Sequence, residues 1–215
     1  MKEPRKENIL TMAMPIGRRE FLVTGAALAL VAAVGVAPAR ADDAEAAGFL
    51  KNFADQMAAV VNGAGDTNAK GQALTPLIDT NVDVATIARF CLGRFWNGAS
   101  PAQQARYVTV FHRVMLNNIR GHLGEYQGVS FEMTGTRPQG DDVVVGTIIN
   151  RPNQPPANVG WVVSRGTGSP KVVDVIAEGA SLRLQQRDDY ASYLRQHGND
   201  ISALISALER QVSGG

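Results

Sequence analysis

Residues able to do acid–base, nucleophilic or metal chemistry are few in this chain and form no familiar catalytic pattern. The sequence holds three histidines and one cysteine, Cys91, which cannot make an internal disulfide and is expected to be a buried small apolar residue. The motifs G-x-S-x-G, G-x-x-x-x-G-K-[ST], H-E-x-x-H and the dinucleotide loop are all absent. These absences argue against the enzymes that depend on those motifs.

Two of the histidines, His112 and His122, lie on one expected helix. A spacing of ten residues places them about 80° apart around the axis and about 15 Å apart along it. This is too far for both side chains to bind one metal ion. We therefore interpret them as structural residues and expect no metal site.

The candidate acids and bases are Asp174, Glu178 and the pair Asp188-Asp189. Nothing in the sequence places an activating partner beside any of these carboxylates. Asp174 interrupts an apolar strand, so we expect an ion pair with Arg183 or Arg187. These residues argue against an enzyme, and no cofactor is expected.

The composition is that of a folded protein and not of a disordered one. The 215 residues are 45% hydrophobic and 19% charged, and 21 basic residues nearly balance 20 acidic ones. A net charge of +1 implies no basic face large enough to hold a polyphosphate backbone. Nucleic acid is therefore not expected as a partner.

Residues 1–41 read as a cleaved export signal. Arg18-Arg19 precedes an uncharged stretch from Phe21 to Ala39, and Ala39-Arg40-Ala41 is an A-x-A site with cleavage expected after Ala41. The arginine pair resembles a twin-arginine signal, which we favour over the general secretory route. The alternative, a membrane anchor, fits less well because about 17 apolar residues are short for a stable span. We predict a periplasmic protein with one domain over residues 42–215.

The exported part is predicted to be an α+β domain in which a four-stranded antiparallel curved sheet packs against N-terminal and C-terminal helices. Apolar spacing and stop signals predict helices over residues 43–61, 69–78, 84–92 and 101–124, and two more after Ser181, separated at His197-Gly198. Asp83 and Ser100 are expected N-caps. Residues 129–133, 143–150, 159–164 and 172–177 are predicted strands. Consecutive valines such as Val143-Val144-Val145 indicate strands that are covered on both faces.

Two separated stretches of the sequence carry a family resemblance. The first is Asp83-Val84-Ala85-Thr86-Ile87-Ala88-Arg89-Phe90-Cys91-Leu92-Gly93-Arg94-Phe95-Trp96, followed by Ser100-Pro101-Ala102-Gln103-Gln104. The second is Val172-Val173-Asp174-Val175 and Glu178-Gly179-Ala180-Ser181-Leu182, followed by Arg187, Tyr190, Gly198, Asp200 and Leu204. Together they resemble the MlaC family of periplasmic lipid carriers, also called the toluene-tolerance family.

The resemblance implies a shuttle that holds the acyl tails of a phospholipid between a curved sheet and its helices. Such a carrier moves lipid between an outer-membrane lipoprotein complex and an inner-membrane ABC transporter and so maintains the lipid asymmetry of the outer membrane. Two positions depart from the family pattern. The Trp that usually precedes the D-V strand is absent, and Trp161 lies one strand earlier, an arrangement similar to the hopanoid-associated branch HpnM. The tyrosine that is usual near Asn118 and Ile119 is also missing. A hopanoid is therefore the alternative ligand.

A lipid carrier must offer an apolar lining in place of water, because a diacyl lipid exposes roughly 30 methylenes at a cost on the order of 20 to 25 kcal/mol. The candidate lining residues are Val143, Val145, Ile149, Val159, Trp161, Val163, Val173 and Val175 on the strands, with Phe111, Met115 and Ile119 on the long helix. An empty cavity of about 500 Å³ would cost about 12 kcal/mol, so the pocket is expected to be filled or collapsed. The polar head is expected at its mouth, held by hydrogen bonds and not by a cationic cluster.

Two other interpretations of these residues stay open. All of them can be ordinary core, in which case the chain is an interaction module that docks to a membrane complex. A hydrolase or lyase with a similar cupped sheet would need an acid or base inside the cup, and only Asp174 and Thr147 are polar at the strand centres. The sequence favours the carrier over both.

Overall fold

The computed structural model of the chain describes residues 41–164, 166 and 168–213. The predicted export signal lies outside this part, apart from Ala41, which is the first residue of helix α1 (Ala41–Asn62). No helix of the described part is both long and apolar enough to span a bilayer.

The first part of the described chain, residues 41–126, is helical, as predicted. α1 is followed by α2 (Thr67–Asn81), α3 (Val84–Leu92), a 3-10 turn η1 (Gly93–Gly98), the long helix α4 (Pro101–His122) and a second 3-10 turn η2 (Leu123–Tyr126). Both predicted N-caps are confirmed: the Asp83 carboxylate accepts from the Thr86 amide, and Ser100 forms a capping box with Gln103. Local side-chain chemistry therefore sets where these helices begin.

Helix α2 is longer than the predicted range 69–78. It begins two residues earlier because Asp66 caps it by accepting from the Ala69 amide. It also continues past Pro76, which removes one backbone donor but leaves Leu74 and Ile78 buried on either side. Burial of this apolar face holds the last turn in place.

The C-terminal half contains an antiparallel meander with strand order β1-β2-β3-β4-β5. The strands are β1 (Ser130–Gln139), β2 (Asp142–Asn150), β3 (Ala157–Ser164), β4 (Lys171–Ala177) and the two-residue β5 (Ala180–Ser181). The expected sheet had four strands. The fifth is formed by a tight hairpin in which Glu178 and Gly179 both have positive φ, 50° and 83°.

One irregularity in the sheet decides which way the side chains of β4 point. Val163 pairs with Val172, but the preceding residue, Val162, pairs with Asp174. Val173 is therefore an extra, bulged residue, and the alternation of β4 changes parity there. Val172 and Val175 thus share one face of the sheet, whereas simple alternation would place Val173 with Val175.

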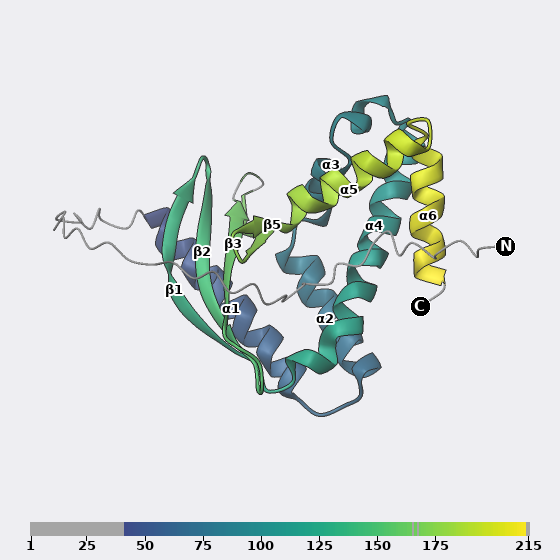
Figure 1. The fold of residues 1–215 in the computed structure, drawn as a ribbon. Helices are drawn as coiled ribbons and strands as arrows, with labels where there is room; N and C mark the ends of the chain where they lie inside the picture. The colour runs from purple at the N-terminus through teal and green to yellow at the C-terminus, as the bar shows by residue number, and fades with distance from the viewer. Residues whose placement is uncertain (1–40, 165, 167, 214–215) are drawn as a thin grey trace, which may run out of the picture.

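The described residues form two large apolar cores. In Figure 1 the sheet and α1 lie at one side of the molecule, and α4 with the C-terminal helices lies at the other. One core is formed by α3, α4 and the C-terminal helices α5 (Leu182–Gln196) and α6 (Ile201–Ser213), which close the helical end. The other lies between one face of the sheet and helices α1, α2 and α4. We call that face of the sheet the inner face and this second core the inner layer. Helix α4 contributes to both cores.

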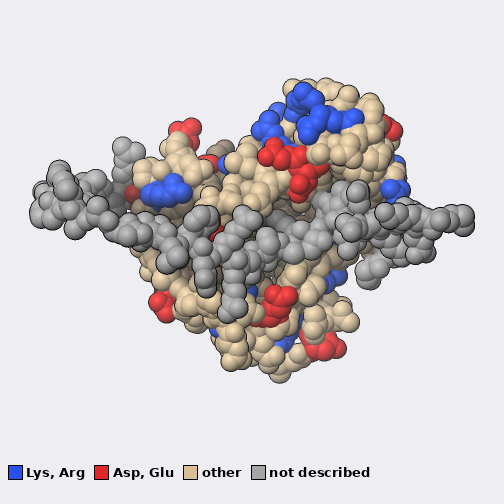
Figure 2. Space-filling view, viewed as in Figure 1, with Lys and Arg blue, Asp and Glu red and all other residues tan. Residues whose placement is uncertain are grey.

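Charged side chains on the surface form small groups of both signs on the face that Figure 2 shows. The largest basic group there lies at the end of the molecule near η1 and α5 (Figure 2). Arginines of this region rest on aromatic rings, with Arg89 over Trp96 and Arg94 over Phe95.

Candidate functional site

All of the predicted strand residues except Val173 belong to the inner layer. The strand pairing aligns Val143 with Val163, and Val145 with Trp161, which in turn pairs with Val175. Ile149 and Val159 continue the same face toward the other end of the sheet. The structure thus brings these residues together as one continuous apolar surface.

Three helices cover the inner face. Leu50 and Phe53 of α1, Ile78 of α2, and the predicted residues Met115 and Ile119 of α4 pack against it. Leu50 and Phe53 lie three residues apart, so both side chains are on the side of α1 that contacts the sheet. The predicted residues of two separate elements, the sheet and α4, therefore meet.

Trp161 is held in the inner layer by a polar anchor. Its indole Nε1 donates to the Thr147 hydroxyl at 2.9 Å, and that hydroxyl donates to the Val159 carbonyl at 3.3 Å. The Phe53 ring meets the indole edge to face, with 6.3 Å between centroids. Thr147 is 1% exposed and its hydroxyl is fully engaged, so it supplies neither an acid nor a base.

Two predicted lining residues lie outside the inner layer. Val173 is the bulged residue of β4 and packs with Val144 and Val162. Phe111 belongs to the helical core, where its ring lies 5.9 Å from that of Tyr107 and 6.4 Å from that of Tyr190. The sequence placed Phe111 with Met115 because they are four residues apart, but α4 passes from one core to the other between them.

The inner layer is closed by direct contact between the sheet and its helices. Leu50, Phe53, Val145 and Val163 pack in one cluster and are each at most 1% exposed. In this structure the residues expected to line a pocket therefore pack against residues of the covering helices. Acyl chains would have to take the place of these contacts.

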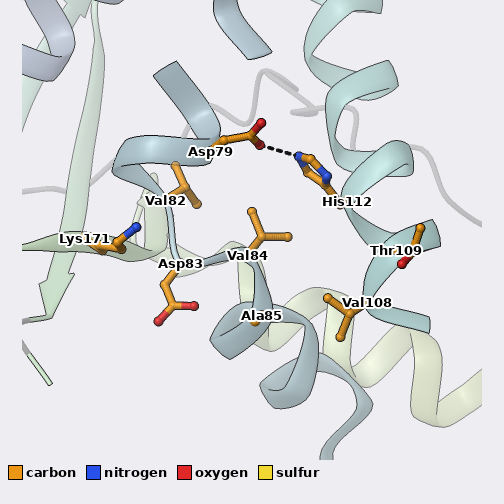
Figure 3. A pocket seen from close by; sticks show the side chains of 9 residues that line it. All are labelled: Asp79, Val82, Asp83, Val84, Ala85, Val108, Thr109, His112 and Lys171. Atoms are coloured by element: carbon orange, nitrogen blue, oxygen red, sulfur yellow. Dashed lines mark ion pairs between the residues drawn. The ribbon is translucent and has the colours of Figure 1, made fainter. Parts of the chain in front are cut away.

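A groove of about 550 Å³ borders the inner layer near the start of β4 (Figure 3). Val82 and Val84 line the groove and also pack against the inner layer. On its polar side His112 Nε2 lies 2.8 Å from Asp79 Oδ1, joining α4 to α2. His122 instead pairs with Glu125, so the two histidines of α4 make different contacts.

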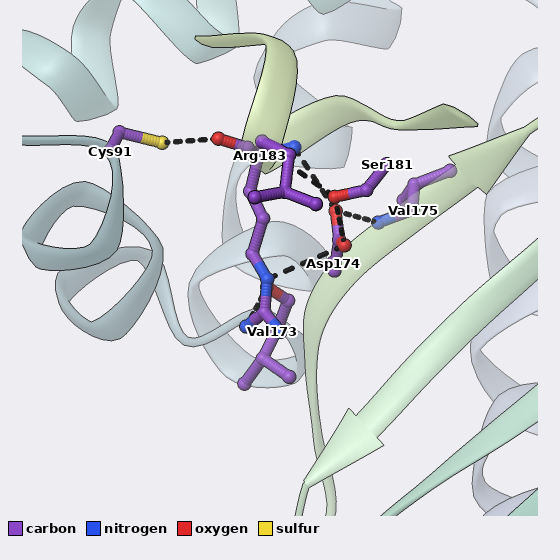
Figure 4. A network of polar contacts seen from close by, with 7 residues as sticks. Cys91, Val173, Asp174, Val175, Ser181 and Arg183 are labelled. Atoms are coloured by element: carbon purple, nitrogen blue, oxygen red, sulfur yellow. Dashed lines mark hydrogen bonds and ion pairs between the residues drawn. The ribbon is translucent and has the colours of Figure 1, made fainter. Parts of the chain in front are cut away.

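The predicted ion pair of Asp174 is confirmed with Arg183, whose Nε lies 3.4 Å from Asp174 Oδ2 (Figure 4). The carboxylate also accepts from the Ser181 hydroxyl at 2.6 Å and from the amides of Val175 and Arg183. Asp174 therefore ties β4 to the start of α5. All of its oxygen contacts are structural, which leaves no free acid or base here.

Cys91 is buried and free, as predicted. Its thiol lies 3.6 Å from the Arg183 carbonyl (Figure 4). Burial, with a smaller contribution from the nearby Asp174 charge, raises the pKa of this thiol to about 12. The thiol is therefore protonated and unreactive at neutral pH.

Sequence reasoning missed one buried charge, Arg151, which follows β2 directly and is 6% exposed. The signal that could have found it is the strand alternation. Thr147 and Ile149 face the inner layer, and position 151 comes next in that series.

The family model described as "MlaC protein" matches residues 51–210, which run from α1 to α6. The chain belongs to the MlaC family. Among solved structures, a phospholipid-binding protein from Ralstonia solanacearum, determined in complex with a phospholipid, matches with a TM-score of 0.71 and 22% sequence identity. The alignment covers 79% of this chain and 98% of that one, so the two share the fold. The MlaC resemblance of the two sequence stretches is thereby confirmed.

The range that matches the MlaC family contains most of the inner layer. It includes Phe53 of α1, the whole of α2 and α4, and all five strands. The apolar surface described above is therefore a feature of the part of this chain that defines it as an MlaC protein.

Proposed function

We propose that this chain binds a phospholipid, with the acyl chains in the inner layer, and carries it without chemical change. The observation that carries the proposal is the continuity of the inner layer, in which one apolar sheet face meets apolar residues of three helices. The family and the phospholipid ligand of the Ralstonia solanacearum protein support it. An apolar lining offsets the cost on the order of 20 to 25 kcal/mol that water would impose on free lipid tails.

Lipid loading requires the contact between the inner face and α1 to open. The closed layer is held by apolar contacts such as Phe53 with Trp161, which acyl methylenes can replace without leaving a polar group unpaired. The Thr147 hydroxyl is already bonded to the sheet and stays so. Exchange of one apolar contact for another makes opening compatible with a marginally stable domain.

The proposed place of action is the periplasm, between an outer-membrane lipoprotein complex and an inner-membrane ABC transporter. It rests on the export signal of residues 1–41 and on family membership. Substitution of Arg18 and Arg19 by lysine should block export if the twin-arginine route is used. Export of that variant at the normal rate would assign the chain to the general secretory route.

A hopanoid is the second candidate ligand, favoured by the position of Trp161 in the middle of the inner layer. A rigid polycyclic ligand would stack on the indole, whereas acyl chains would pack around it. Mass spectrometry of lipid extracted from the purified protein decides between the two. Recovery of no lipid in stoichiometric amount, with an unchanged melting temperature after delipidation, would favour a plain interaction module.

Contact between lipid and the inner layer can be measured with the two tryptophans of the chain. In the Trp96→Phe variant the remaining indole is Trp161, and brominated acyl chains should quench its emission. The matched control is Trp161→Phe, which keeps the half-buried Trp96 of η1 and should not be quenched. Equal quenching of both variants would place the lipid elsewhere.

A further inference from the structure

Arg151 carries a buried charge at one end of the inner layer. Its guanidinium lies over the Tyr126 ring, with 5.3 Å from Cζ to the ring centroid. Tyr126 packs in turn against the end of the inner layer formed by Leu123, Val129 and Ile149. β2 and β4 both pair antiparallel with β3, so they point in the same direction. Arg151 follows the end of β2, whereas the groove lies near the start of β4, so the two are at opposite ends of the sheet.

This guanidinium lacks a counterion among the described residues. Its Nε and Nη2 atoms are buried and donate to no acceptor, and no carboxylate of the described part forms an ion pair with it. Arginine cannot shed its proton to escape burial. A buried, uncompensated charge of this kind is strongly destabilising, and the Tyr126 ring face offsets only part of that cost.

The unpaired edge of Arg151 has the geometry of an oxyanion receptor. Nε and Nη2 present two parallel N–H groups, which match two oxygens of a phosphate or carboxylate. Through Tyr126 the guanidinium adjoins the apolar end of the inner layer, where an anion attached to hydrocarbon could place its hydrocarbon part. Only one cationic side chain is involved, which agrees with the expectation that no cationic cluster holds the head.

We propose that Arg151 binds the phosphate group of the phospholipid whose acyl chains occupy the inner layer. The proposal rests on the proposed function and adds the orientation of the lipid, with its phosphate at the η2 end and away from the groove. The same guanidinium edge would also bind inorganic phosphate. Phospholipid and sodium phosphate are therefore tested separately.

The test compares binding of a phospholipid and of the diacylglycerol with the same acyl chains to delipidated protein, using quenching of Trp161 in the Trp96→Phe background. The protein with Arg151 should bind the phospholipid roughly tenfold or more tightly than the diacylglycerol. In Arg151→Gln the two affinities should agree within about twofold. Arg137→Gln is the matched control, since Arg137 is exposed on β1, and it should keep the wild-type preference.

Stability separates a binding role from a purely structural one. If Arg151 awaits a ligand, delipidated Arg151→Gln should melt at or above the wild-type temperature, because an unpaired buried charge is gone. Added phospholipid should also raise the melting temperature of Arg151→Gln by less than it raises that of the wild type. A delipidated variant that melts several degrees lower, with the lipid preference intact, would overturn the proposal and make Arg151 a structural residue.

The remaining outcomes distinguish this proposal from the proposed function. Loss of the phospholipid preference in Lys171→Gln, and not in Arg151→Gln, would place the phosphate at the groove and overturn the assignment. Sodium phosphate is the second ligand tested. If it stabilises the wild-type protein as strongly as phospholipid does, and does not stabilise Arg151→Gln, Arg151 is a site for free phosphate. Failure of wild type to bind either lipid would overturn the carrier function itself.

Discussion

The indole nitrogen of Trp161 is hydrogen bonded to the hydroxyl of Thr147 across two neighbouring strands, at 2.9 Å. This bond satisfies the one polar atom of the indole inside an apolar layer, so the ring can face hydrocarbon on its remaining sides. The indole ring also meets the Phe53 ring of α1, at the contact that we propose opens when lipid loads.

Replacing Thr147 by valine keeps the shape of the side chain and removes the acceptor. The buried indole N–H is then unsatisfied, and the free energy of unfolding should fall by about 1 to 3 kcal/mol. Urea unfolding followed by circular dichroism measures this. Thr109→Val on the exposed side of α4 is the control and should change stability by less than about 0.5 kcal/mol. Equal losses in the two variants would mean that the Trp161 bond contributes nothing.

Phe111 and Met115 should respond differently to substitution, because they lie in different cores. Phe111→Leu should lower the free energy of unfolding by about 1 to 2 kcal/mol and leave quenching by brominated lipid unchanged. Met115→Gln should weaken lipid binding roughly tenfold, because its amide would face acyl chains without a partner. A larger effect of Phe111→Leu on lipid binding would show that the helical core takes part in the site.

Asp174→Asn should lower the free energy of unfolding by about 2 to 4 kcal/mol, since the amide cannot accept every bond that the carboxylate receives and leaves Arg183 uncompensated. Asp174 is 5% exposed, so added salt should not remove the difference. Asp188→Asn, at an exposed position of α5, is the matched control. Equal stability of the two variants would contradict a structural role for the network in Figure 4.

Cys91 should make stability depend on alkaline pH. Its ordinary pKa is 9.0, and burial raises the native pKa to about 12. The protonated thiol therefore stabilises the native state fully below about pH 9, and this stabilisation is lost as the pH rises toward 12. Between these values the free energy of unfolding should fall by up to about 1.4 kcal/mol per pH unit more in wild type than in Cys91→Ala. Urea unfolding at pH 8, 9.5 and 10.5 measures the two slopes, and parallel slopes would contradict the buried thiol.

Two buried tyrosines near Cys91 also contribute to the alkaline pH dependence of stability. Burial raises the pKa of Tyr107 and Tyr190 well above the usual range, so both add alkaline sensitivity of the same sign. Cys91 also contributes to the raised pKa of both tyrosines, so the difference between the two slopes reports the thiol together with its effect on them.

Most elements, and the starts of α3 and α4, were predictable because they depend on residues close in sequence. Asp83 and Ser100 cap their helices through amides three residues away, and the β-branched runs pair in sequence order. β5 was missed because two residues carry no periodic signal. The family resemblance likewise rested on contiguous motifs, and the family match confirms it.

The sequence by itself determined the helices, the meander, the apolar character of the inner layer and the pairing of Asp174 with one of two arginines, of which the structure shows Arg183. Only the tertiary structure decided the side of the sheet on which Val173 lies, the core that holds Phe111 and the burial of Arg151. A bulge depends on the register of the neighbouring strand, and the core that a helix residue enters depends on what packs beside that turn. Both are set by contacts between residues distant in sequence, which periodicity along one segment does not record.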